Sequence, residues 1–155
     1  MIYTENNRGI IQDRENFHQK VLYGGMRYGK CMPTDIDAMM EFNNKVCIMW
    51  ELKYGSAPIP YGQKTLMERN ADKWNQCGDI GIVFRCSHMT PSDRDISLAD
   101  SIVTDTYYNG TWHREKIAKR VKDRTDEFLR WCRDVKGIDL GNIELDDETI
   151  RRAIL

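Results

Sequence analysis

The chain has 155 residues, of which 41% are hydrophobic and 30% charged, and its formal net charge is −1. This size and composition are typical of one globular domain with a sizeable core, and no segment approaches the ~20 consecutive apolar residues that span a membrane. The N-terminal segment is polar and acidic, unlike a secretory signal, so we expect a cytoplasmic protein without a membrane partner. The near-neutral charge does not by itself indicate a nucleic-acid-binding protein.

The first half of the chain predicts a helix, a strand hairpin and a second helix. A helix is expected where apolar residues recur at helical spacing, and strands where apolar residues alternate or run together. The dipeptide Asn43-Asn44 favours a turn between the two strands. These elements cover residues 12–23, 34–42, 45–53 and 61–74.

The second half predicts a strand, a hairpin and a last helix. Asn109-Gly110, between β-branched and aromatic residues, is the strongest hairpin signal of the chain. These elements cover residues 79–87, 100–112 and 119–136. Alternating helices and strands of this kind predict an α/β fold with a mixed β-sheet flanked by helices, followed by a C-terminal hairpin and helix.

Five cysteines occur without a CxxC pair, which favours reduced and mostly buried thiols. Cys86 and His88 could form half of a zinc site, but no second close pair would complete it. Zinc is therefore not expected.

Charges are unevenly distributed in the C-terminal half. From His113 to Lys136, nine Lys or Arg side chains accompany five acids, whereas residues 139–148 hold five acids and no base. A basic helix of this kind can bind phosphates, or it can be a solvated helix with i,i+4 ion pairs, and composition alone favours the second interpretation. The candidate phosphate-binding residues are Lys119, Arg120 and Lys122, with Lys64 from the second helix.

The strand over 45–53 ends in charged residues that a buried strand disfavours. Glu51 and Lys53 are two residues apart, so both point to the same face. Burying such charges unpaired costs on the order of several kcal/mol. Asp35 and Asp37 share a face of the preceding strand, and the turn can bring that face beside Glu51.

This grouping suits the hydrolysis of phosphodiesters. Two carboxylates on neighbouring strands are oxygen ligands for a hard cation such as Mg²⁺, and a lysine beside them can hold and polarise an attacking water. A surface cluster of the same charges is the alternative, because an Asp followed by ExK is common by chance. The position of the ExK at the end of an apolar strand, one hairpin after the acid, favours the site.

The segments Pro33–Asp37 (PTDID) and Trp50–Lys53 (WELK) resemble the PD-(D/E)xK nuclease superfamily, whose core runs helix, strands, helix, strand. The resemblance covers roughly residues 12–87 and includes small stand-alone members that are common in phages and mobile elements. It implies a restriction-endonuclease-like core, with residues 88–155 as a C-terminal extension, inside a single nuclease-like domain of residues 1–155.

By this resemblance, Asp37 and Glu51 would bind Mg²⁺ or Mn²⁺ together with the backbone carbonyl of Leu52. Lys53 would position the attacking water. Asp35 is the alternative ligand to Asp37, because Thr34 interrupts the literal PD spacing.

Further roles follow from the same resemblance. Gln63 would contact the site, the alternative being an ordinary polar residue in a first helical turn. Glu15 resembles an accessory acid of some family branches, although an ordinary early-turn glutamate is the favoured interpretation. Tyr54 and Tyr61 flank the site and are candidates to stack on bases, with packing as the alternative.

The sequence therefore predicts a metal-dependent endonuclease that cleaves DNA, with RNA as an alternative substrate. A nuclease fold that binds nucleic acid or inhibits a partner protein without turnover is the competing function. One site cuts one strand, so cleavage of both strands would need a homodimer.

Overall fold

The structure, a computed structural model, describes residues 25–145. The chain divides into two units, Met1–Thr34 and Asp35–Leu155. In the described part of the first unit, Tyr28 and Cys31 form an isolated antiparallel bridge with N–H···O distances of 2.8 and 3.0 Å. The helix predicted over 12–23 lies outside the described residues.

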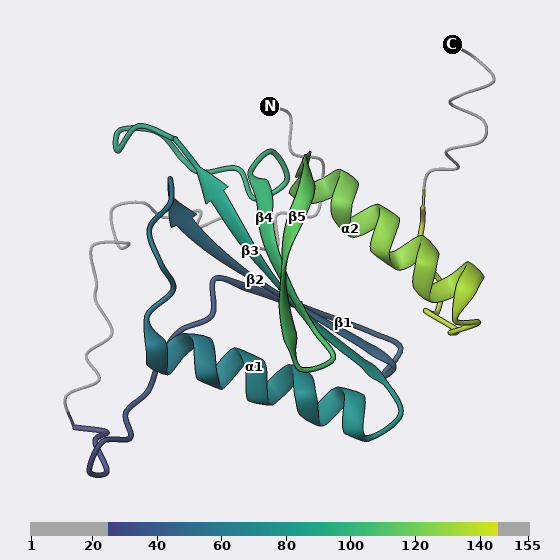
Figure 1. The fold of residues 1–155 in the computed structure, drawn as a ribbon, viewed down its shortest axis with the longest axis horizontal. Helices are drawn as coiled ribbons and strands as arrows, with labels where there is room; N and C mark the ends of the chain where they lie inside the picture. The colour runs from purple at the N-terminus through teal and green to yellow at the C-terminus, as the bar shows by residue number, and fades with distance from the viewer. Residues whose placement is uncertain (1–24, 146–155) are drawn as a thin grey trace. The chain divides into compact units, whose positions relative to one another are not determined.

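The second unit is an α/β fold on a five-stranded mixed sheet, which confirms the predicted fold class at this level. The sheet order is β1-β2-β3-β4-β5, and only the β2–β3 pair is parallel. The strands are β1 Ala38–Phe42, β2 Val46–Tyr54, β3 Ile80–His88, β4 Ile102–Tyr108 and β5 Thr111–Arg120. Helix α1 Tyr61–Gln76 covers one face, and helix α2 Val121–Arg130, continued by the π-helical turn η2 Trp131–Val135, covers the other (Figure 1). Within residues 25–145, no helix is long and apolar enough to cross a membrane.

Both predicted hairpin turns are present. Asn43 and Asn44 have φ values of 50° and 56°, and Asn109 and Gly110 have 51° and 85°. Positive φ at both central residues matches the right-handed twist of the flanking strands, which explains why asparagine and glycine stand there.

The last helix begins two residues later than predicted. Lys119 and Arg120 pair with Val103 and Ile102 as the end of β5, and α2 starts at Val121. Cross-strand pairing therefore overrides the local helical pattern. The basic segment is consequently divided between a strand and a helix instead of forming one helical face.

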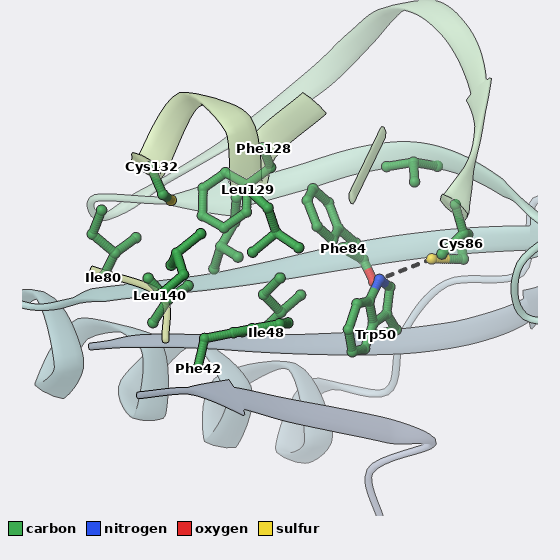
Figure 2. Packing of buried hydrophobic residues seen from close by; sticks show 14 residues of the cluster. Phe42, Ile48, Trp50, Ile80, Phe84, Cys86, Phe128, Leu129, Cys132 and Leu140 are labelled. Carbon is green, nitrogen blue, oxygen red and sulfur yellow. Dashed lines mark hydrogen bonds between the residues drawn. The ribbon is translucent and has the colours of Figure 1, made fainter. Parts of the chain in front are cut away.

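Strand β2 contributes to the packing on both sides of the sheet, which explains its continuous apolar run. Val46, Ile48 and Trp50 face α2 and belong to the larger core shown in Figure 2. Cys47 and Met49 face the opposite way and pack with buried residues of α1. The following odd-numbered residues of β2 therefore also point to the α1 side.

Helix α1 approaches β3 so closely that a side chain cannot fit at Gly81. A Cβ there would lie 2.5 Å from the Ala71 carbonyl oxygen and 2.9 Å from Trp74 Cβ. The Asn75 side chain accepts from the Gly81 N–H at 3.0 Å and donates to the Gly81 carbonyl at 3.3 Å. This contact fixes α1 against the sheet.

We expect Gly81→Ala to destabilise the protein by about 1–3 kcal/mol, because the added methyl group overpacks the contact with the α1 backbone. Chemical denaturation measures the change. Gly62→Ala is the matched control: nothing lies within 4 Å of its Cβ position, and alanine in a helix is neutral or stabilising. Equal stabilities of the two variants would contradict the close approach.

Candidate active site

The β1–β2 register places Asp37 beside Glu51. Ala38 pairs with Trp50 at the end of the antiparallel ladder, so the next position brings Asp37 opposite Glu51. Residues directly opposite in such a ladder share a face of the sheet. Because the odd-numbered residues of β2 face α1, Asp37, Glu51 and Lys53 project to that side.

The Asp37 side chain takes the place of a backbone hydrogen-bond acceptor at the end of the β1–β2 ladder. Asp37 lies just before the first residue of β1, Ala38, and its Oδ2 accepts a hydrogen bond from the Leu52 N–H at 2.7 Å. In an extended strand, the N–H and C=O of one residue point to the same neighbour. The Leu52 carbonyl is therefore directed to the side on which the exposed Asp37 lies.

Glu51 is the buried acid of the group. It is 1% exposed, and its carboxylate is 2.9 Å from Lys53 Nζ through Oε1. Among the described residues, its other oxygen, Oε2, is buried without a hydrogen-bond partner. Burial raises the pKa of Glu51 and the negative charge of Asp37 adds to this, while the contacts with Lys53 and the Asp37 backbone act against it.

Gln63 connects α1 to the charged residues. It is 8% exposed in the first turn of α1, and its Oε1 accepts a hydrogen bond from Lys53 Nζ at 3.5 Å. Its Nε2 donates to the Asp35 carbonyl oxygen at 2.8 Å. Asp35 thus contributes a backbone oxygen to this contact, while the residue itself is exposed.

The donor set fits a hard divalent cation. Carboxylate and carbonyl oxygens are the ligands that Mg²⁺ and Mn²⁺ prefer, with water in the remaining positions. The unpartnered Oε2 of Glu51, beside a second carboxylate, is a buried negative charge that a cation would satisfy. Among residues 25–145 no three His, Cys, Asp or Glu side chains form a metal-binding group, so such a cation would depend on Asp37, Glu51, the Leu52 carbonyl and water.

Arg85 is a positioning residue that the sequence patterns did not single out. It is the β3 neighbour of Glu51 in the parallel ladder. Its guanidinium donates to Gly55 O (3.2 Å), Ala57 O (2.5 Å) and Thr104 Oγ1 (2.8 Å). Arg85 therefore holds the loop between β2 and α1, and with it the helix start that carries Gln63. An arginine inside the apolar run over 79–87 was the available signal.

The other candidate residues near the site lie around it. Tyr54 and Tyr61 are 56% and 84% exposed at the two ends of the β2–α1 loop. Lys64 Nζ lies 4.0 Å from Glu68 and 5.7 Å from the centre of the Trp112 ring. Glu15 lies outside the described residues.

The candidate phosphate-binding residues at the end of β5 and the start of α2 are paired with acids. Lys119 pairs with Glu127, Lys122 with Asp126, and Arg120 with Asp100 (3.1 Å) and Asp123 (3.0 Å). The Lys122 pair has the i,i+4 spacing typical of a solvated helix. The positive charges of this region are therefore compensated locally.

Comparisons with protein-family models, curated proteins and solved structures give no match to this chain. The chemistry of the site is therefore argued from its own geometry.

We expect Mg²⁺ and Mn²⁺ to raise the melting temperature in a concentration-dependent way, because a ligand that binds only the folded state stabilises it. Asp37→Asn and Glu51→Gln should lose this shift, and Asp35→Asn should keep it. In chelator, Glu51→Gln should be more stable than the unaltered protein by about 1 kcal/mol, because the amide removes a buried charge. Thermal denaturation over a metal titration measures all three variants. A metal-induced shift that persists in both Asp37→Asn and Glu51→Gln would exclude this site.

Proposed function

We propose that this chain is a metal-dependent nuclease that hydrolyses phosphodiester bonds in DNA. The observation that carries the proposal is the buried Glu51, with one oxygen unpartnered, beside Asp37 and Lys53 on one face of the sheet. A structural ion pair would need only Glu51 and Lys53. The second carboxylate and the unpartnered oxygen instead suit a cation that is shared with a phosphate.

Membership of the PD-(D/E)xK superfamily, with a restriction-endonuclease-like core, is part of this proposal. The order β1, β2, α1, β3 supports it, because the superfamily's core continues after its first helix as strands, helix, strand. The register adds support, since it brings the proposed Asp37 and Glu51 ligands opposite each other.

Each residue of the site has its own role in the proposed hydrolysis. A bound Mg²⁺ or Mn²⁺ would polarise the phosphate and favour deprotonation of a water molecule. Asp37, Glu51 and the Leu52 carbonyl would hold that cation. The Lys53 ammonium, held between Glu51 Oε1 and Gln63 Oε1, orients the attacking water and stabilises the negative charge that develops on the phosphate oxygens.

The hydrogen bonds of Gln63 determine where Lys53 lies. With its Nε2 fixed on the Asp35 carbonyl, the Gln63 amide presents Oε1 to Lys53. The water oxygen attacks phosphorus and gives up a proton to solvent, the phosphorus–oxygen bond to the leaving nucleotide breaks, and the leaving oxygen takes a proton from solvent. The products are a phosphate monoester and a hydroxyl group.

We expect cleavage of labelled DNA to require Mg²⁺ or Mn²⁺ and to stop in chelator, whereas Ca²⁺ should support binding with little turnover. Lys53→Ala should lower the cleavage rate by about 100-fold or more, the effect of removing one preorganised donor from developing charge. Gel electrophoresis of linear, supercoiled and branched DNA measures the rates, with RNA tested in parallel.

Lys45→Ala is the matched control, because Lys45 precedes the same strand and pairs only at the surface, 3.8 Å from Asp79. It should cleave at the unaltered rate. Cleavage that persists in chelator would refute the metal mechanism. Metal-dependent DNA binding without turnover would identify a binding module in place of an enzyme.

Lys119, Arg120 and Lys122 are proposed to contact the DNA backbone. If they do, charge reversal at all three should weaken binding about equally for every sequence and flatten its dependence on salt. Fluorescence anisotropy over a salt series measures both. The metal-induced change in melting temperature should be unaffected. Unchanged affinity and salt slope would identify these residues as a solvated surface.

A further inference from the structure

A cavity of about 440 Å³ lies at the carboxyl ends of β2 and β3, next to the candidate active site. Tyr54 directly follows Lys53 and lines this cavity, together with His88 and the segment after β3. Consecutive side chains of a strand point to opposite faces. The reacting phosphate near Lys53 and an occupant of the cavity would therefore lie on either side of the end of β2.

The aromatic wall of the cavity is held in a defined orientation. Tyr54 is 56% exposed, and His88 packs edge-on against it, with ring centres 5.7 Å apart and planes at 83°. His88 Nδ1 accepts a hydrogen bond from the Thr90 N–H at 3.3 Å, which orients the ring. The Gly55 N–H donates to the His88 carbonyl at 2.9 Å and ties the two strand ends together.

The remaining lining combines cationic and polar side chains with the apolar Pro91 and Ile96. Arg94 supplies a guanidinium, and Thr90 and Ser92 supply hydroxyl groups. Among the described residues that line the cavity, none is acidic, although Asp93 and Asp95 flank Arg94 in the sequence. An aromatic ring beside an arginine and hydroxyl donors suits a ligand with a flat ring and an anionic group.

We propose that this cavity binds one unpaired nucleotide of the strand being cut, with its base against Tyr54 and its phosphate beside Arg94. The inference rests on the proposed nuclease function and specifies its substrate class. The volume is within the range of small-ligand pockets. A base inside a duplex is stacked on both faces and enters such a pocket only after unpairing. The substrate is therefore single-stranded or branched nucleic acid, unpaired next to the cleaved bond.

The test measures binding of the whole chain to fluorescent oligonucleotides in Ca²⁺, so that the readout does not depend on turnover. One oligonucleotide is intact. Each of the others has the same sequence but lacks one base, at a position that differs from one oligonucleotide to the next. We expect one abasic position to weaken binding by about 10-fold, the loss of one base-stacking contact. Tyr54→Ala should weaken binding of the intact strand by a similar factor.

The double-mutant cycle identifies the contact. Tyr54→Ala and the abasic position together should reduce the binding affinity no more than either change alone, because both remove the same stacking pair. Tyr54→Phe should restore binding. Arg94→Ala should weaken binding of the intact and the abasic strands equally, since the Arg94 guanidinium contacts the phosphate and not the base. Arg69→Ala, an exposed arginine of α1, is the matched control and should change neither.

Additive losses, or equal binding of intact and abasic strands at every position, would overturn the nucleotide site. If the cycle is non-additive but no strand is cleaved in Mg²⁺ or Mn²⁺, the nucleotide site stands and the nuclease proposal fails. If duplex DNA is cleaved as fast as single strands and the losses are additive, the nuclease stands and the nucleotide site fails. Ribose and deoxyribose versions of the same strands show which nucleic acid is preferred.

Discussion

The burial of Glu51 is the constraint on which the arrangement of the site depends. A carboxylate that is 1% exposed and hydrogen-bonded through one oxygen destabilises the folded state unless positive charge lies beside it. Lys53 supplies part of that charge, and Gln63 fixes Lys53. Gly81 allows α1 to approach the sheet, and Arg85 holds the loop that precedes α1. These contacts together maintain an environment that is unfavourable for Glu51 in the absence of a cation.

The alternation of side chains along β2 places core residues on one face of the sheet and residues of the candidate site on the other. On one side of β2, Trp50 packs in the larger core (Figure 2). Its indole N–H also donates to Thr125 of α2 at 3.3 Å. On the other side, the adjacent Glu51 lies among polar partners. Glu51 thus extends from the buried part of a central strand, which limits its movement.

The features that were predictable from sequence are those with a local signal. Both turns follow from asparagine and glycine, and the shared face of Glu51 and Lys53 follows from their spacing. The choice between Asp35 and Asp37 depends on the register across the hairpin, which the turn residues do not specify. Arg85 escaped prediction because its backbone partners lie 28 and 30 residues away. The start of α2 was misplaced because cross-strand pairing extends β5 over residues whose local pattern is helical.

The alternation along β2 also limits how this sequence can diverge. Insertion or deletion of a single residue in the Asn43-Asn44 turn would shift β1 by one position and place Asp37 on the face occupied by Trp50. Substitutions in the turn leave the register unchanged if they accept its backbone conformation. The segment over 89–101, between β3 and β4, is not constrained by the β1–β2 register. Among descendants of this chain, the spacing from Asp37 to Glu51 should therefore stay constant.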